Sequence, residues 1–189
     1  NVLIVLFIAY LIVVMFIYFY QRKLLYHPSE NNYLDETNLN HKIEKIYVQS
    51  DTKLISWYYN NNKSHKTILF FHGNAGRLDN RVYKLNELAK LNINYLIVAY
   101  RGFSGNQGKP SEVGIYKDSN AAKNWLNENG VDDKNIILYG ESLGTAVAVD
   151  LASKNNFAGI ILESPFTSMI KLAKKYYPYL PVKILLKDK

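Results

Sequence analysis

A serine between two glycines is the feature of this sequence that most plainly carries chemistry. Gly140, Ser142 and Gly144 form the pattern G-x-S-x-G in "YGESLGTAVAVDLA". An apolar run precedes the pattern and a helix-forming run follows it, so Ser142 is expected on a tight turn from a strand into a helix, exposed as a nucleophile for acyl transfer. Side chains two positions before and after the serine would crowd the strand and the helix, which is why glycine is expected there.

Such a turn also supplies donors for the negative charge that develops on an attacked carbonyl group. Free N–H groups at the start of the following helix point toward the serine, and the N–H of Leu143 is the first expected donor. The second should come from "FFHGNAGR", where His72 and Gly73 end another apolar run. We expect the backbone N–H of Asn74 to complete this oxyanion hole, with the N–H of Ala75 as the alternative.

Alternating strands and helices must hold these two turns together. Short runs at 42–50 and 52–60 predict a pair of antiparallel strands. Further strands are expected in 66–71, 93–101, 134–140 and 157–166, and helices in 81–92, 111–130 and 143–155. This order predicts an α/β fold, with a mostly parallel sheet and helices on both faces. Ligands gather at the carboxyl ends of such strands, where the Gly-rich stretches stand.

The stretches "LFFHGNAGR", "AYRGFSGNQGKPSE", "YGESLGTAVAVDLA" and "LESPFTS" resemble, in order and spacing, the membrane-anchored α/β-hydrolase-domain proteins related to the serine aminopeptidase-like hydrolases. The resemblance implies the α/β-hydrolase fold and a serine hydrolase acting on esters or thioesters, with lipid and acyl-protein hydrolases among its characterised relatives. Carried over by position, Ser142 is the nucleophile, and Asn74 and Leu143 line the oxyanion hole. The loop "YRGFSG" shapes the rim of the site, with structural glycines.

The general base of such a site is missing from its expected place. In the family the triad runs Ser, then acid, then His, but no histidine follows Ser142. The acids after it are Asp150, Glu163 and Asp188, and a carboxylate with a pKa of about 4 does not replace an imidazole as a proton shuttle near pH 7. His72 is an alternative base because its strand is expected beside that of the serine, although in the family the matching histidine shapes the oxyanion turn.

The other three histidines, His27, His41 and His65, fall in the linker or between early strands, where solvated roles are expected. The resemblance implies two further strands, with the triad acid on the loop after one and the histidine on the loop after the other, and we expect both beyond Lys189. On this interpretation the sequence is truncated at its C-terminus. The 189 residues alone would then be inactive or nearly so, with an open sheet edge.

The first twenty residues contain no charge, no glycine and no proline. As a helix they would extend about 30 Å, the thickness of the hydrocarbon core of a bilayer, which predicts a membrane-spanning segment. Tyr18 and Tyr20 stand beside Arg22 and Lys23 as interfacial anchors do. A signal peptide is the alternative, but no small-residue cleavage site follows. The predicted organisation is a transmembrane anchor at 1–21, a linker at 22–41 and a hydrolase domain at 42–189.

Composition limits the other classes of protein. A chain of 189 residues with 48% hydrophobic residues has room for about one domain with a sizeable core. The net charge of +7 comes from lysines scattered among acids, which does not indicate a nucleic-acid partner. There is no cysteine and no metal-ligand spacing, and a P-loop fails because Phe103 and Pro110 occupy required positions. No cofactor or metal is expected.

The segment "TSMIKLAKKYYPYLPVKILLKDK" is basic and rich in tyrosine. One interpretation is a helix with a solvated lysine face that ends before Pro178. The other is that the segment caps the active site and rests on anionic lipid headgroups through Lys171, Lys174 and Lys175.

The resulting hypothesis is a single-pass membrane serine hydrolase that cleaves esters or thioesters through an acyl-enzyme on Ser142. Its partners would be the bilayer and a small-molecule, lipid or acyl-protein substrate. The side of the membrane on which the hydrolase domain lies stays open, because charges before Asn1 would weigh in the balance. The alternatives are a catalytically silent α/β-hydrolase scaffold with a binding role, and a peptidase-like serine hydrolase.

Overall fold

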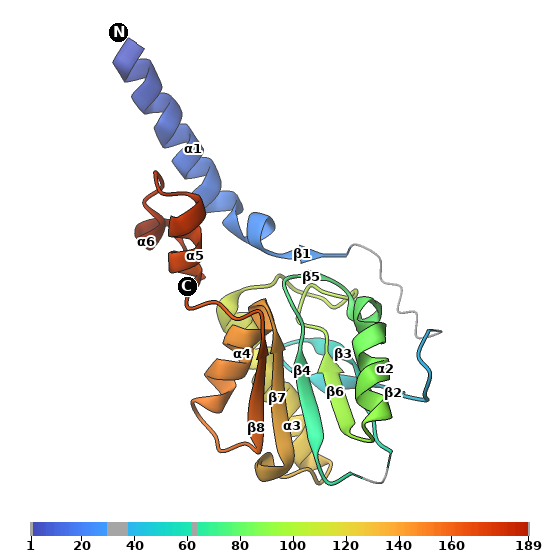
Figure 1. Cartoon of the computed structure of the whole chain (residues 1–189). Coiled ribbons are helices and arrows are strands. Elements are labelled where there is room, and N and C mark those ends of the chain that lie inside the picture. Colours follow the sequence, from blue (N-terminus) through green and yellow to red (C-terminus); the bar gives the residue numbers. More distant parts are fainter. Residues whose placement is uncertain (1, 30–37, 62–63, 189) are drawn as a thin grey trace. The chain divides into compact units, whose positions relative to one another are not determined.

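The computed structural model describes residues 2–29, 38–61 and 64–188, and it divides into two compact units. The α/β unit is Pro28–Pro165, and the terminal unit joins Asn1–His27 to Phe166–Lys189 (Figure 1). Residues 30–37 of the predicted linker lie outside the described residues.

A six-stranded sheet forms the centre of the α/β unit, in the order β2-β3-β6-β4-β7-β8. Its strands are β2 (Glu44–Gln49), β3 (Lys53–Tyr59), β4 (Thr67–Phe71), β6 (Asn94–Val98), β7 (Ile136–Glu141) and β8 (Gly159–Glu163). β2 and β3 are antiparallel as predicted, and β3 is antiparallel to β6. β6, β4, β7 and β8 run parallel. The predicted mostly parallel sheet is confirmed.

The helices of this unit follow the predicted alternation. They are α2 (Val82–Lys90), α3 (Glu112–Glu128) and α4 (Leu143–Ala152), with two short 3₁₀ turns at Leu78–Arg81 and Asp133–Asn135. Two very short strands, β1 (His27–Pro28) and β5 (Ala75–Gly76), complete the elements of the sheets. The predicted cap of α3 is confirmed, because the hydroxyl of Ser111 accepts the Gly114 N–H at 3.2 Å.

Strand order places the helices on both faces and marks where a ligand site is expected. From β4 the chain passes through α2 to β6 on one side, then returns through α3 to β7 on the other side of β4, and continues through α4 to β8. Crossovers between parallel strands are right-handed, so opposite directions put α2 on one face and α3 with α4 on the other. The carboxyl ends of β4 and β7 therefore form the switch point of the sheet, where ligands bind in such folds.

Burial distinguishes the inner strands from the outer one. Every residue of β4 and β6 is buried, as expected of strands covered on both faces. β8 is the last strand of the sheet within the described residues, and Ile160, Ile161 and Leu162 are 42%, 44% and 38% exposed. The core of the unit thus lies around β4, β6 and β7, directly beneath the two turns that carry the predicted site.

The terminal unit contains α1 (Val2–Leu25), α5 (Met169–Tyr176) and α6 (Val182–Leu185). Within it the side chain of Gln21 donates to the carbonyl of Leu185 at 3.0 Å and accepts the N–H of Lys187 at 2.8 Å. Arg22 forms an ion pair with Asp188 at 3.0 Å. α5 ends before Pro178, as the first interpretation of the basic segment predicts. By length and composition, α1 is long and apolar enough to cross a membrane.

Candidate active site

The turn between β7 and α4 holds Ser142 in an unusual backbone conformation. Its φ is 51° and its ψ is −112°, a region that L-residues rarely adopt. Residues held in such regions cost about 1–3 kcal/mol and persist where the surrounding structure enforces them. Here the Ser142 N–H donates to the carbonyl of Glu163 at 2.9 Å, and its own carbonyl accepts the N–H of Thr145 at 2.9 Å. The serine is thus fixed between β8 and the first turn of α4, with its side chain partly exposed.

Glycine is sterically required on both sides of this serine. A Cβ at Gly140 would lie 2.4 Å from the Gly144 carbonyl oxygen and 2.6 Å from the Cα of Thr145. A Cβ at Gly144 would lie 2.0 Å from the carbonyl oxygen of Phe71, the last residue of β4. Because these atoms belong to the backbone, no side-chain movement would relieve either clash. The spacing G-x-S-x-G is therefore a consequence of how closely α4 approaches β4 and β7.

The second turn, after β4, lies directly against the residue that precedes the serine. A Cβ at Gly73 would be 3.4 Å from the Oε1 atom of Glu141 and 3.6 Å from its carbonyl oxygen. Gly73 is buried, and Asn74 beside it is partly exposed. Leu143 begins α4, so its N–H has no partner within the helix. The turn that carries Asn74 and the turn that carries Ser142 and Leu143 therefore lie side by side at the carboxyl ends of β4 and β7.

His72 is a packed part of the turn after β4. Its Nδ1–H donates to the carbonyl of Gly73 at 2.7 Å, and its ring lies 4.2 Å from the ring of Tyr100 and 5.0 Å from that of Phe103, between centroids. Burial, aided by the nearby Arg81 charge, lowers the pKa of His72 to about 3. A group so weakly basic is poorly matched to proton transfer near pH 7. These contacts make His72 part of the packing of the turn after β4.

Other histidines of the α/β unit lie away from the two turns. The Nε2 atom of His41 is 2.6 Å from the hydroxyl of Tyr95, near the amino end of β6. His65 precedes β4 and so stands at its amino end. Among the described histidines of this unit, His72 is the one that lies at the carboxyl end of a strand, directly after β4. The expectation that the general base lies beyond Lys189 therefore stays a prediction.

The acids named from the sequence have partners of their own. Asp150 on α4 forms an ion pair at 2.6 Å with Lys154, which lies just past the end of that helix. In the terminal unit, Asp188 accepts hydrogen bonds from Arg22 and from the hydroxyl of Tyr26. Among the described residues, no group of three or more His, Asp or Glu could hold a metal ion.

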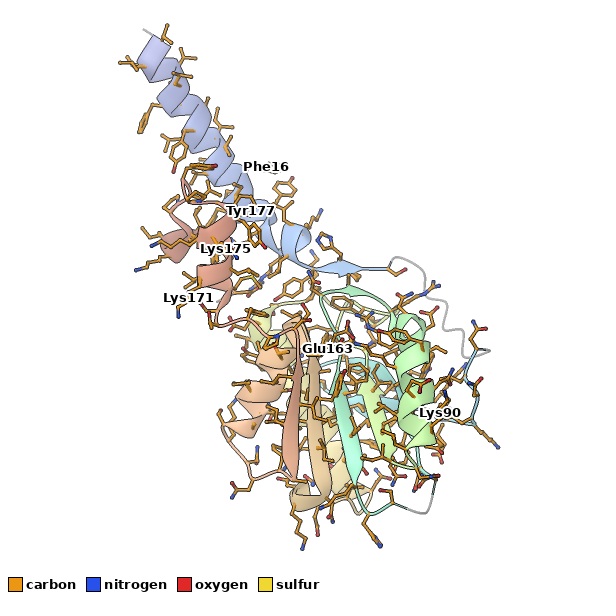
Figure 2. All side chains as sticks on the ribbon, in the orientation of Figure 1. Phe16, Lys90, Glu163, Lys171, Lys175 and Tyr177 are labelled. Atoms are coloured by element: carbon orange, nitrogen blue, oxygen red, sulfur yellow. The ribbon has the colours of Figure 1, made fainter. Side chains whose placement is uncertain are left out.

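Glu163, which Figure 2 labels, is the last residue of β8 and belongs to a charged cluster; its carbonyl accepts the N–H of Ser142 at 2.9 Å. Lys84 on α2 contacts Glu163 at 2.5 Å and Glu141 at 3.0 Å, and the hydroxyl of Tyr139 donates to Glu163. The ammonium group of Lys84 and the Tyr139 hydrogen bond lower the pKa of Glu163. Burial, with the Glu163 hydrogen bond, raises the pKa of Tyr139 to about 12. Near neutral pH this cluster therefore holds ionised Glu163 beside a neutral tyrosine.

The loop after β6 is held by a buried ion pair. Arg101 contacts the fully buried carboxylate of Asp118 on α3 at 2.7 Å, and the hydroxyl of Ser50 donates to the same carboxylate at 2.8 Å. Further along the loop, the hydroxyl of Ser104 accepts the N–H of Leu78 at 3.1 Å. The "YRGFSG" loop is thereby tied to the segment that follows the turn after β4.

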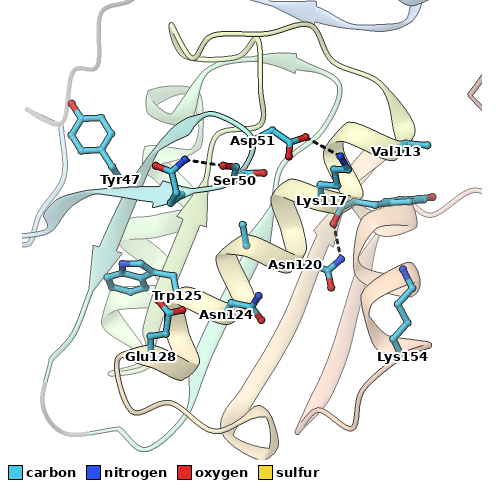
Figure 3. A pocket seen from close by; sticks show the side chains of 13 residues that line it. Tyr47, Ser50, Asp51, Val113, Lys117, Asn120, Asn124, Trp125, Glu128 and Lys154 are labelled. Carbon is cyan, nitrogen blue, oxygen red and sulfur yellow. Dashed lines mark hydrogen bonds and ion pairs between the residues drawn. The ribbon is translucent and has the colours of Figure 1, made fainter.

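A separate groove lies between α3 and the β2–β3 hairpin (Figure 3). It is open, has a volume of about 860 Å³, and is lined by Tyr47, Trp125 and the Asp51–Lys117 ion pair, among others. None of the residues predicted for catalysis lines it.

Comparison with known proteins places this fold and these turns in a family. A family model described as "Alpha/beta hydrolase of unknown function (DUF1057)" matches residues 36–173, which include both turns. The chain belongs to the α/β-hydrolase family. An α/β hydrolase from Vibrio vulnificus aligns with a TM-score of 0.67 and 29% identity over 79% of this chain and 57% of that one. An esterase from Pyrococcus furiosus aligns with a TM-score of 0.63 at 22% identity, covering 85% of this chain and 66% of that one, and supports the fold.

Curated relatives agree with this assignment. This α/β hydrolase is 38% identical to an uncharacterized protein of Mycobacterium tuberculosis over 93% of this chain and 64% of that protein. It is 33% identical to protein bem46 of Schizosaccharomyces pombe over 89% of this chain and 61% of bem46. The chain therefore spans less than two thirds of the length of these relatives.

Sequence reasoning did not single out the charged residues that surround the two turns of this α/β hydrolase. Arg81 and Lys84 were part of a predicted helical stretch, and Glu141 was only the variable position of the serine motif. Their contacts join residues 57 to 79 positions apart in the chain. No spacing rule links these residues. The one available signal was that acidic residues stand at the ends of β7 and β8, and basic residues stand at the start of α2.

Proposed function

We propose that this α/β hydrolase is a serine hydrolase that cleaves carboxylic esters or thioesters through an acyl-enzyme on Ser142. The observation that carries the proposal is the backbone of Ser142, which has a φ of 51°. The flanking positions 140 and 144 leave no room for any residue larger than glycine. Strain of this kind at the switch point of an α/β sheet is typical of a functional turn.

In the proposed reaction the Ser142 hydroxyl attacks the carbonyl carbon of the substrate. The carbonyl oxygen becomes an anion, which accepts hydrogen bonds from the backbone N–H groups of Asn74 and Leu143. The bond to the alcohol or thiol breaks, the leaving group takes up the proton that Ser142 gave up, and water then hydrolyses the acyl-enzyme. Because His72 is too weak a base, the proposal requires a histidine outside the described residues to carry the proton.

The proposed substrates are lipids or other acyl compounds at a membrane surface. α1 would span the bilayer, with Arg22 and Lys23 at its end in the headgroup region. α5 carries Lys171, Lys174 and Lys175, two of which Figure 2 marks, and would rest on anionic headgroups. These assignments follow from composition and exposure, since the side chains of α1 are mostly exposed in the structure.

Hydrolysis by the full-length gene product tests this function. We expect turnover of acyl esters or acyl thioesters of graded chain length, and a fall in kcat/KM of at least about 1,000-fold in Ser142→Ala. Ser164→Ala is the matched control, because Ser164 stands at the same edge with a φ of 54° and is exposed. A wild-type protein without turnover would favour the catalytically silent scaffold.

The membrane part has a test of its own. Replacing the three α5 lysines by glutamine should lower activity on vesicles that contain anionic lipid, with little effect on neutral vesicles or a soluble ester. Equal loss on both kinds of vesicle would contradict a role in contacting headgroups.

A further inference from the structure

We propose that Arg81 is a positioning residue that, through Glu141, fixes the distance between the two halves of the oxyanion hole. The inference rests on the proposed function of Ser142 and adds to it a side chain that never touches the substrate. It arises from the contacts that Arg81 makes with both turns.

Arg81 lies at the start of α2, and its side chain is 9% exposed. Its Nη1 atom donates to the carbonyl of Ala75 at 2.9 Å and to that of Arg77 at 3.4 Å. Its Nη2 atom donates to Oε1 of Glu141 at 3.2 Å. One rigid, planar guanidinium group therefore bonds the backbone after β4 and the carboxylate at the end of β7 at the same time.

The two bonded positions are next to the proposed oxyanion donors. Ala75 directly follows Asn74, and Glu141 directly precedes Ser142, with Leu143 one residue further. The ion pair also lies against the turn itself, because a Cβ at Gly73 would be 3.4 Å from both Nη2 of Arg81 and Oε1 of Glu141. A change in the length of the Arg81–Glu141 contact would therefore move one donor relative to the other.

The ladder of the sheet fixes the two strands but not the turn beyond them. β4 and β7 are paired in register up to Phe71 and Gly140. The turn after β4 starts past this last pair, at His72, and reaches Asn74 two residues later. Of the described side chains that bond the carbonyls of this turn, Arg81 is the one that also bonds the residue before the serine. Catalysis through an oxyanion hole depends on donor positions to within a fraction of an ångström, which is what such a clamp would supply.

Removal of Arg81 is a workable test because it does not strand Glu141. Lys84 contacts the other carboxylate oxygen of Glu141 at 3.0 Å and would keep that charge paired. Arg77 offers a matched control on the same turn, since its side chain forms an ion pair with Asp79 at 2.7 Å. Arg77→Met therefore removes a neighbouring arginine without breaking the contact to Glu141.

The experiment uses the full-length gene product and an ester substrate that the wild type hydrolyses. Arg81→Met is expected to lower kcat by about 100-fold with KM within about threefold, since a misplaced donor acts in the transition state. Affinity for a boronic acid that mimics the tetrahedral intermediate should fall by a similar factor. The kcat of Arg81→Lys should lie between those of the wild type and Arg81→Met, because an ammonium group pairs with Glu141 but does not reproduce the planar guanidinium group. Arg77→Met should match the wild type.

Several results would overturn the inference. One is an unchanged kcat in folded Arg81→Met, and another is a raised KM with kcat intact. A third is a lower kcat with unchanged boronic acid affinity, which would show that the oxyanion hole was not disturbed. If Arg81→Met does not fold, judged by its unfolding transition, Glu141→Gln takes its place and must show the same joint loss, smaller in size. A wild type without turnover removes the proposed function and this inference with it, whereas an active wild type with an unaffected Arg81→Met removes the inference alone.

Discussion

The two turns that meet at the switch point of the sheet are held in different ways. The turn with Ser142 is fixed by the backbone, because Gly140 and Gly144 leave no room for a Cβ and the neighbouring N–H and C=O groups are bonded to β8 and α4. The turn with Asn74 is fixed by side chains that arrive from elsewhere, chiefly Arg81. Backbone sterics leave a pattern in the sequence, whereas contacts between distant side chains do not. The turn with Ser142 could therefore be predicted from the sequence, whereas the turn with Asn74 could be predicted only in part.

Alanine at Gly144 should give the largest effect of this comparison. Its Cβ would meet the Phe71 carbonyl at 2.0 Å, so α4 and β4 must separate. We expect a loss of more than about 3 kcal/mol in the free energy of unfolding, the upper range for overpacked sites. Gly73→Ala is the matched variant, since its Cβ would contact only side-chain ends at 3.4 Å and a carbonyl at 3.6 Å. Chemical denaturation measures both, and equal losses would contradict the distinction between the two turns.

Removal of the carboxylate of Asp118 should come next in size. The Asp118→Asn variant leaves the guanidinium of Arg101 facing a neutral amide in a buried place. Breaking a buried ion pair typically costs about 3 kcal/mol or more, and partial compensation by Asp51 at 3.2 Å should keep the loss near the lower figure. The same denaturation experiment applies, with Asp132→Asn on an exposed pair as the control. A loss below that of the control would mean that the rim loop is held by other contacts.

Acidification should lower the free energy of unfolding through His72. The folded-state pKa of His72 is about 3 because of burial, below its ordinary value of 6.5, so the unfolded chain binds an extra proton between these values. The contribution of neutral His72 to the free energy of unfolding is therefore fully present above about pH 6.5. It falls as the pH is lowered toward 3, by about 2 kcal/mol at pH 5. His72→Asn should remove this part of the slope between pH 7 and pH 5, whatever its stability at pH 7. An identical slope in the variant would show that His72 is not buried as a neutral ring.

Ser104→Ala should give the smallest of these effects. The variant leaves the buried N–H of Leu78 without the hydroxyl that accepts it at 3.1 Å. Loss of a partner for a buried donor costs about 1–3 kcal/mol, and a value near 1 is expected if water enters from the loop. Because the bond joins the rim loop to the segment after β5, hydrogen exchange at Leu78 should quicken more than exchange in β7. Equal protection of Leu78 in both proteins would argue against this tie.

The sequence was sufficient for the elements that depend on local patterns. The strands β4, β6 and β7, the Ser111 cap of α3 and the antiparallel pair β2–β3 were all predicted and are confirmed. Their signals are periodicity, apolar runs and capping residues, which act over a few positions. The full strand order, which makes the site a switch point, was not predicted, and only the neighbourhood of the strands before His72 and Ser142 was expected.

The charged frame of the site lay beyond such reasoning. Arg81 meets Glu141 across 60 positions, and Arg101 meets Asp118 across 17, so neither pair has a local signature. The low basicity of His72 also needed the structure, because it arises from burial among Tyr100 and Phe103. Residue type alone left that histidine open as a base.

The identity of the nucleophile is the claim on which the account depends, and covalent labelling tests it directly. The full-length gene product would be treated with a fluorophosphonate and digested, and the modified peptide located by mass spectrometry. The account predicts a single adduct on Ser142, absent from Ser142→Ala and present in Ser164→Ala. An unlabelled wild-type protein, or an adduct that persists on another residue in Ser142→Ala, would contradict it.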